Sequence, residues 1–504
     1  MQIKHGKSFI STKWWFINFL IILPYCVSAQ LQQDDRLEIP LFSDQEAFDA
    51  IPASDEGVML FRKIESRVGD QLELIQLDTQ LHQQWRGTLP LDFNQSLEKK
   101  TVFKRHLYLV FRNNNFSNAS FLLYKIDIKT GDYIKYTIHN VLPFIPTVFS
   151  VTSNGSLIGG YFNRVPVVLF FDFKTQKSKI LPGLFNEPGE LNQLKINADE
   201  SYDVLISAKN YQKQQTIWVK NYDPTGKLIR NVMLQPDGNH NLIFGRTIQM
   251  NNKDQIIAGV YGNRSGEYSN GLFIARLTAD GLQQMHYYNF ADLENFFNYL
   301  RSKKINRIKE RIQRKKLKGK KIKFQYSLIV HELLADQNQF VLLGEAFYKK
   351  YRTMENQSIM SSSYNRPIIF DGYQYTHAVL LGIDQSGKLL WDNSFEINDV
   401  RTFTLEQFVK IDVQNDKIVL LYLFDNKLRS KIIQDNTVLE GKASNDIRLN
   451  SAEDLSSEDG TSMSRLEYWY GNHFVAYGVQ NVVSNTFSLR RKKKVFFINK
   501  ISYR

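Results

Sequence analysis

The chain has 504 residues, with 64 Lys or Arg against 51 Asp or Glu, and a single cysteine, Cys26. A chain of this length can bury enough apolar surface to fold without cross-links, and one cysteine excludes a disulfide framework or a thiolate metal site. The positive charge is local, because residues 301–323 carry 13 Lys or Arg and one acid, whereas the remainder of 30–504 carries 48 basic and 50 acidic residues. The high pI is therefore not a property of the whole surface.

The N-terminal segment 1–29 is predicted to be a signal peptide. It contains three lysines before residue 14, an uncharged apolar run over 14–27, and the small residues Ser28-Ala29 at its end. The apolar run of about 14 residues is shorter than the roughly 20 that span a membrane. We expect cleavage before Gln30 and export to the periplasm or the outside of the cell; an uncleaved anchor is the alternative. No later stretch is apolar enough to predict a transmembrane span.

A strand that ends in a polar residue returns about every fifty residues along the rest of the chain. Most intervals are 45–55 residues and one is 106. Four short strands fit each interval; in 190–236 they are expected at 191–196, 204–208, 216–222 and 227–234. A four-stranded unit repeated at this period is typical of a β-propeller, and we expect an all-β propeller of eight blades, with seven as the alternative. The polar end residues are Asp78, Asp127, Asp172, Asp223, Thr278, Asp384 and Asp435.

The two ends of the chain are predicted to close the ring. The final strand pattern at 496–502 places Ser502 at the same point of the repeat, so the last blade lacks one strand. Leu37–Phe42 is an unassigned strand candidate. Its pairing into the last blade would leave no open sheet edge, which makes 30–504 one propeller domain.

One turn sequence carries a family resemblance. Residues 384–391, Asp-Gln-Ser-Gly-Lys-Leu-Leu-Trp, resemble the Asp-x-x-Gly-x-x-x-Trp turn of exported bacterial propeller repeats of the quinoprotein-like style, and Asp78 with Trp85 keeps the offset. The resemblance implies a propeller and brings no catalytic residue with it. A quinone-dependent oxidoreductase is a third functional possibility, but the sequence shows no metal cluster to hold such a cofactor.

The 106-residue interval contains a basic insertion, residues 291–325. Apolar residues recur there at helical spacing, and a helix is expected from about 291 to 317 with Asn289 as its N-cap. The alternatives for this helix are a solvated insertion packed on the propeller, a contact with an anionic envelope surface, or a contact with a partner protein. Nucleic acid is not expected, since 301–323 holds no aromatic residue to stack a base. The contact candidates on the helix are Arg307, Arg311 and Arg314.

Two further segments interrupt the repeat. The stretch 348–375 is rich in tyrosine and is expected to be a long loop before the strand 377–383, with Tyr373 and Tyr375 as ligand-contact candidates. Residues 444–463 carry five acids and one arginine among Ser and Asn, which indicates a mobile acidic loop.

No catalytic constellation is evident. His331-Glu332-Leu333-Leu334-Ala335 has Ala where a zinc-binding helix would need its second histidine. We expect no catalytic residue, no metal and no cofactor. The function predicted is that of an exported, non-enzymatic binding or scaffold protein of the bacterial envelope, which contacts an unknown protein or an anionic surface. The alternative is a polysaccharide-active hydrolase or lyase with carboxylates at the propeller mouth.

Overall fold

The computed structural model describes residues 31–503 apart from short ranges. The predicted signal peptide lies outside the described residues. The ranges not described within 31–503 are 66–68, 93, 114–119, 140–141, 185–187, 251–252, 264–267, 321, 323, 354–367, 415–416, 451–454, 457–463 and 485–490.

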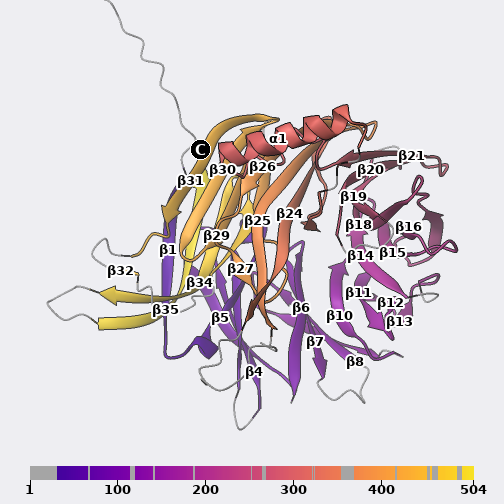
Figure 1. Cartoon of the computed structure of the whole chain (residues 1–504). Helices are drawn as coiled ribbons and strands as arrows, with labels where there is room; N and C mark the ends of the chain where they lie inside the picture. The colour runs from indigo at the N-terminus through magenta and orange to yellow at the C-terminus, as the bar shows by residue number, and fades with distance from the viewer. Residues whose placement is uncertain are drawn as a thin grey trace, which may run out of the picture.

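The described residues form eight antiparallel sheets arranged as the blades of a ring (Figure 1). We number the blades 1–8 in the chain order of their inner strands, which are β2, β6, β10, β14, β18, β22, β28 and β33. Successive inner strands contact one another around the centre, except that β23 of blade 6 makes the contact with β28 of blade 7. The prediction of an eight-bladed propeller is confirmed. The strands of blades 1 to 4 are β2 (Asp49–Pro52), β3 (Val58–Ile64), β4 (Gln71–Leu77), β5 (Gln83–Pro90), β6 (Gln95–Phe103), β7 (His106–Asn113), β8 (Ser120–Asp127), β9 (Tyr133–His139), β10 (Ile145–Val151), β11 (Gly155–Phe162), β12 (Val165–Asp172), β13 (Ser178–Ile180), β14 (Gly189–Ile196), β15 (Tyr202–Lys209), β16 (Gln215–Tyr222) and β17 (Leu228–Met233).

Blades 5 and 7 have four strands, whereas blades 6 and 8 carry extra short strands. Blade 6 has the order β22-β24-β25-β26, with β23 on β24 and β27 on β25; blade 8 combines β33, β34, β35 and β32 with β1. The strands of blades 5 to 8 are β18 (His240–Gln249), β19 (Gln255–Asn263), β20 (Gly271–Leu277), β21 (Gln283–Asn289), β22 (Ser327–Val330), β23 (Leu334–Asp336), β24 (Gln339–Thr353), β25 (Ile368–Asp384), β26 (Leu389–Glu396), β27 (Arg401–Thr402), β28 (Lys410–Gln414), β29 (Lys417–Phe424), β30 (Lys427–Gln434), β31 (Thr437–Asp446), β32 (Leu455–Ser456), β33 (Ser464–Tyr470), β34 (His473–Ser484), β35 (Arg491–Tyr503) and β1 (Leu31–Leu41).

The repeated aspartates act in the turns between third and fourth strands. Asp223 Oδ1 accepts hydrogen bonds from the backbone N–H of Thr225 and Lys227, each at 2.9 Å, and Gly226 follows with φ +82°. Asp384 repeats the arrangement, with Gly387 at φ +84°. A short carboxylate can replace the missing backbone acceptor in a tight turn, and glycine adopts positive φ without a steric penalty. This is the physical basis of the repeat seen in the sequence.

The ring closes through the N-terminal strand. β1 pairs antiparallel with β35, with Leu37 opposite Ile498 and Ile39 opposite Phe496, and Figure 1 shows the indigo β1 beside the yellow C-terminal strands. The predicted completion of the last blade is confirmed. Blade 8 is then joined to blade 1 by Trp469, whose Nε1 donates to the carbonyl oxygens of Ser54 at 2.8 Å and Gly57 at 3.0 Å.

The inserted helix is shorter than expected and begins later. α1 (Ser302–Leu317) is the only α-helix in the described part of the chain, and it starts after Arg301 without a side-chain cap. Asn289 does not cap it; its side chain instead accepts a hydrogen bond from the N–H of Ala291. The expectation of helix over 291–301 is wrong.

The physical reason lies in the backbone. Phe290, Leu293, Phe296 and Phe297 lie in the hydrophobic cluster between blades 5 and 6 at a spacing that one helix face would also allow, so their burial alone does not exclude a helix. The backbone N–H groups of this segment are satisfied from outside: Asp392 Oδ atoms accept those of residues 294 and 295 at 2.9 and 2.7 Å.

Two other expectations change in detail. The tyrosine-rich stretch is not one long loop, because residues 348–353 continue β24 and 368–375 begin β25; 354–367 lies outside the described residues. In the predicted acidic loop, residues 444–446 end β31 and Leu455–Ser456 forms β32, while 451–454 and 457–463 lie outside the described residues.

Removing β1 should open the ring. A chain that begins at Phe42 exposes the paired edge of β35 and should unfold at a lower temperature and aggregate, because an uncovered strand edge recruits other strands. A chain that begins at Leu31 is the control and should match the full-length protein. Calorimetry with light scattering measures both, and equal melting temperatures without aggregation would contradict the closure.

Candidate functional site

The outer surface of α1 is the strongest charged feature of the described structure. The helix presents eight cationic side chains and one acid, Glu310, over 16 residues, about 24 Å at 1.5 Å per residue. The three predicted contact residues Arg307, Arg311 and Arg314 are all exposed. Figure 1 shows α1 at the upper edge of the ring. The cations are Lys303, Lys304, Arg307, Lys309, Arg311, Arg314, Lys315 and Lys316.

The apolar side chains of α1 fix which face is outward. Ile308 and Ile312, one turn apart, pack against the cluster between blades 5 and 6. The helix therefore cannot rotate its arginines inward without exposing these isoleucines.

The electrostatics of α1 are unbalanced. Among the described residues the helix makes a single ion pair, between Lys316 Nζ and Asp292 Oδ1 at 2.9 Å. Its first turn holds no acid to complement the helix dipole, whereas Lys303 and Lys304 lie there. Like charges three and four residues apart repel. An anion placed against this surface would relieve both effects.

The predicted tyrosines occupy different environments. Tyr375 is 1% exposed, and its hydroxyl donates to the carbonyl of Glu406 at 2.8 Å, so it belongs to the core between blades 6 and 7. Tyr373 is half-buried against Phe347 and Phe370. Among the described residues of this hairpin, the tyrosines that reach solvent are instead Tyr348 and Tyr351.

Charged residues of the first strands link neighbouring blades around the centre. Lys410 of blade 7 pairs with Glu467 of blade 8 at 2.9 Å. Asp49 of blade 1 pairs with Arg465 of blade 8 at 3.5 Å and with Lys100 of blade 2 at 2.5 Å. Both carboxylates, Asp49 and Glu467, are therefore paired with a cation of a neighbouring blade.

A second group of inner charges surrounds Glu332, just after β22. Its carboxylate accepts a hydrogen bond from the amide of Gln193 and pairs with Arg246 at 3.0 Å and Lys195 at 3.6 Å. Glu332 thus joins blades 4, 5 and 6.

A cavity of about 900 Å³ lies between the first strands of blades 7 and 8. It is lined by three carboxylates, three cations and three phenylalanines, of which Phe403 is 71% exposed. This site could not be predicted from a local sequence pattern, because its walls come from three separate stretches of the chain. The charged lining residues are Arg401, Glu406, Lys410, Asp425, Arg465 and Glu467.

The connectivity brings these features to one face of the ring. In a blade of four antiparallel strands, the fourth strand ends where the first begins, and the turn between the second and third strands lies at that same face. α1 lies in the connection from β21 to β22, the β24–β25 hairpin is a second-to-third turn, and residues 397–409 connect β26 to β28. One face therefore carries the exposed tyrosines, the cavity and the two ends of the connection that contains α1.

The histidine that resembled a metal motif has a structural partner. His331 Nε2 lies 2.6 Å from Glu345 Oε1, and Glu345 also accepts the N–H groups of Phe408 and Val409. Through Glu345, this pair links blade 6 by hydrogen bonds to the segment that leads into blade 7. In the described ranges, no group of three or more His, Cys, Asp or Glu side chains could hold a metal ion.

His377 anchors the segment that leads into α1. Its ring stacks on Tyr299 at 3.8 Å between centroids and meets Phe296 edge-on. Nδ1 lies 3.0 Å from the hydroxyl of Thr376. Burial lowers the pKa of His377 to about 3, so the ring is neutral in the folded protein at ordinary pH.

No known protein family and no characterised sequence matches the chain. Solved structures with a similar fold include the polysaccharide lyase Uly1 (8% identity, 80% of this chain and 89% of that chain, TM-score 0.44) and the Dos1 propeller (10% identity, 81% and 94%, TM-score 0.39). A eukaryotic initiation factor is similar over 90% of both chains at 9% identity and a TM-score of 0.39. Likeness at this level concerns the propeller fold alone.

Acid should weaken the anchor at His377. A histidine in an unfolded chain titrates near 6.5, so between about pH 6.5 and 3 the unfolded chain binds a proton that the native state does not, and stability falls as pH falls through this window. The loss can reach about 1.4 kcal/mol per pH unit. His377→Phe keeps the ring and removes the titration, so urea unfolding at pH 7.5, 5.5 and 4.5 should show a shallower pH dependence in the variant. Equal slopes would contradict the account.

Proposed function

We propose that this protein is an exported binding protein that docks on an anionic surface of lipid or glycolipid headgroups through α1. The observation that carries the proposal is the helix itself, with eight cations on 16 residues, one ion pair among the described residues, and its isoleucines turned inward. The signal-peptide pattern of residues 1–29 supports export.

A layer of anionic headgroups fits the surface of α1 better as a binding partner than another protein does. Protein interfaces depend on buried aromatic or apolar anchors, and the outward face of α1 offers only Leu317 at its last turn. An anionic headgroup layer needs no such anchor, since juxtamembrane Lys and Arg each contribute about 1 kcal/mol near an anionic membrane. No helix in the described part of the chain is long and apolar enough to cross a bilayer, so the contact proposed is peripheral.

The test removes charge from α1 without altering its inward face. Arg307→Gln, Arg311→Gln and Arg314→Gln together should weaken sedimentation with vesicles of phosphatidylglycerol and phosphatidylcholine by roughly 100-fold, at about 1 kcal/mol per charge. Binding of the unaltered protein should also fall as salt rises.

The matched control removes three exposed lysines elsewhere, Lys174, Lys177 and Lys227. It should bind the same vesicles nearly as the unaltered protein does. Both variants should keep the circular dichroism spectrum and melting temperature. Equal loss of binding in both variants, or binding to pure phosphatidylcholine, would contradict a specific role for α1.

The cavity between blades 7 and 8 supports a second candidate, an enzyme acting on polysaccharide. Its carboxylates Glu406 and Glu467 lie beside Lys410 and Arg465, and Phe403 offers an exposed ring surface for a sugar. Paired acids are the groups that glycoside-cleaving chemistry requires.

For this candidate, Glu467→Gln should reduce release of oligosaccharide from acidic polysaccharide by roughly 100-fold, the lower end of a general acid or base contribution. The exposed Asp132→Asn is the control and should leave turnover unchanged. Chromatography of digests measures the products. Absence of turnover by the unaltered protein would rule this candidate out.

A further inference from the structure

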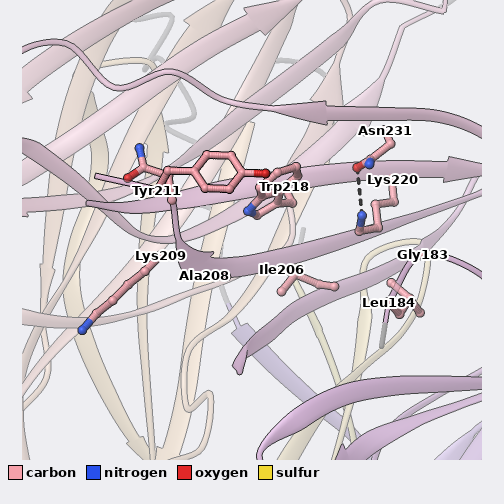
Figure 2. A pocket seen from close by; sticks show the side chains of 10 residues that line it. Gly183, Leu184, Ile206, Ala208, Lys209, Tyr211, Trp218, Lys220 and Asn231 are labelled. Atoms are coloured by element: carbon pink, nitrogen blue, oxygen red, sulfur yellow. Dashed lines mark hydrogen bonds between the residues drawn. The ribbon is translucent and has the colours of Figure 1, made fainter. Parts of the chain in front are cut away.

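A small pocket between blades 3 and 4, separate from α1 and from the large cavity, holds a buried lysine. It has a volume of about 190 Å³ and opens beside β15 and β16 (Figure 2). Lys220 on β16 is 6% exposed, and its Nζ donates to Asn231 Oδ1 at 2.8 Å. Among the described residues Lys220 has no carboxylate partner, and no acid lines the pocket.

Such a lysine is uncommon. Buried lysines are normally paired, because removing an ammonium from water is unfavourable without a counter-charge. Burial also lowers the pKa of Lys220. The neutral amide of Asn231 satisfies one of its three N–H groups, which leaves donors for a ligand.

The structure around Lys220 is organised. Trp218, Lys220 and Tyr222 lie on one side of β16, since alternate strand residues share a face. The Tyr222 hydroxyl donates to the carbonyl of Pro182 at 2.8 Å, which holds the turn that contains Gly183 over the lysine. A Cβ at Gly183 would lie 3.9 Å from Lys220 Nζ, so glycine keeps the space beside the ammonium open.

The remaining walls suit a ring-shaped body. Leu184, Ile206 and Ala208 supply an apolar side, and Trp218 and Tyr211 supply aromatic surface. Figure 2 shows the ring of Tyr211 directed toward Trp218, whereas the Lys209 side chain extends away from the other lining residues. Lys220 is thus the cation that faces the pocket.

We propose that this pocket binds a small monocarboxylate with a ring-shaped body, whose carboxylate pairs with Lys220 and whose ring lies against Trp218. A charge-assisted hydrogen bond to a carboxylate is short and strong in a desolvated site, and a mostly apolar pocket with one well-placed charge is the usual form of a small-molecule site. The ring can be aromatic or a hydroxylated sugar acid.

The test is calorimetric titration of the full chain with benzoate and with glucuronate, which distinguishes the two kinds of ring. At least one should bind with a Kd below about 5 mM, and its neutral analogue, benzyl alcohol or methyl glucoside, should bind about tenfold more weakly or not at all. Failure of both carboxylates to bind, or equal binding of the neutral analogue, overturns the proposal.

Two variants examine the lysine. Lys220→Met keeps the length of the side chain and should weaken carboxylate binding about tenfold or more, without loss of melting temperature, since apolar replacement of a buried charge is often neutral or stabilising. Asn231→Asp supplies an internal counter-charge and should weaken binding to a similar extent.

Lys227→Met makes the same chemical change at an exposed lysine of blade 4 that does not line the pocket, and this variant should bind as the unaltered protein does. Unchanged carboxylate affinity in both Lys220→Met and Asn231→Asp would contradict the assignment.

Discussion

The pairing of β1 with β35 is the interaction on which the rest of the structure depends. Seven blades draw all their strands from consecutive stretches, but the eighth needs a strand from the other end of the described chain. Each blade buries its faces only against its neighbours, so an open ring would leave two faces and one strand edge uncovered. β1 is the outer strand of blade 8. Trp469 lies on β33, the inner strand of the same blade, and donates a hydrogen bond to blade 1, so both strands contribute to the closure.

A closed ring explains why the insertion can carry so much charge. The segment before α1 is held by Phe296 and Phe297 in the core and by Asp392 on its backbone. The helix itself has little intrinsic support, since its first turn lacks an acid and a side-chain cap. Its position therefore derives from packing on a rigid scaffold, and its solvent face is available for an electrostatic contact.

Much of the fold could be predicted because its signals are local. An aspartate whose carboxylate accepts hydrogen bonds from the backbone of its own turn, as that of Asp223 does, recurs once in each of several blades. Such a residue can be recognised from its spacing in the sequence. The closing strand was also predictable, because the count of strands left one missing. The start of α1 was not, since apolar spacing alone cannot distinguish a helix from an irregular segment whose backbone N–H groups bond to a distant side chain, as those of residues 294 and 295 bond to Asp392.

The sites were harder to predict than the fold. Arg307, Arg311 and Arg314 could be predicted because they lie in one short basic segment of the sequence. So many cations close together cannot all be buried, so their exposure could be predicted as well. Tyr375 looked similar to an exposed tyrosine, but its hydroxyl is used by a backbone carbonyl 31 residues away. Lys220 could not be singled out from the sequence, because its burial without a carboxylate partner among the described residues depends on how blades 3 and 4 pack.

Amide hydrogen exchange of residues 31–41 tests the closed ring most directly. The β1 amides that bond to β35 should exchange as slowly as those in the middle of β34, because both would open only with the whole ring. Exchange of the β1 amides within seconds, while β34 stays protected, would show that the N-terminal strand does not complete the eighth blade.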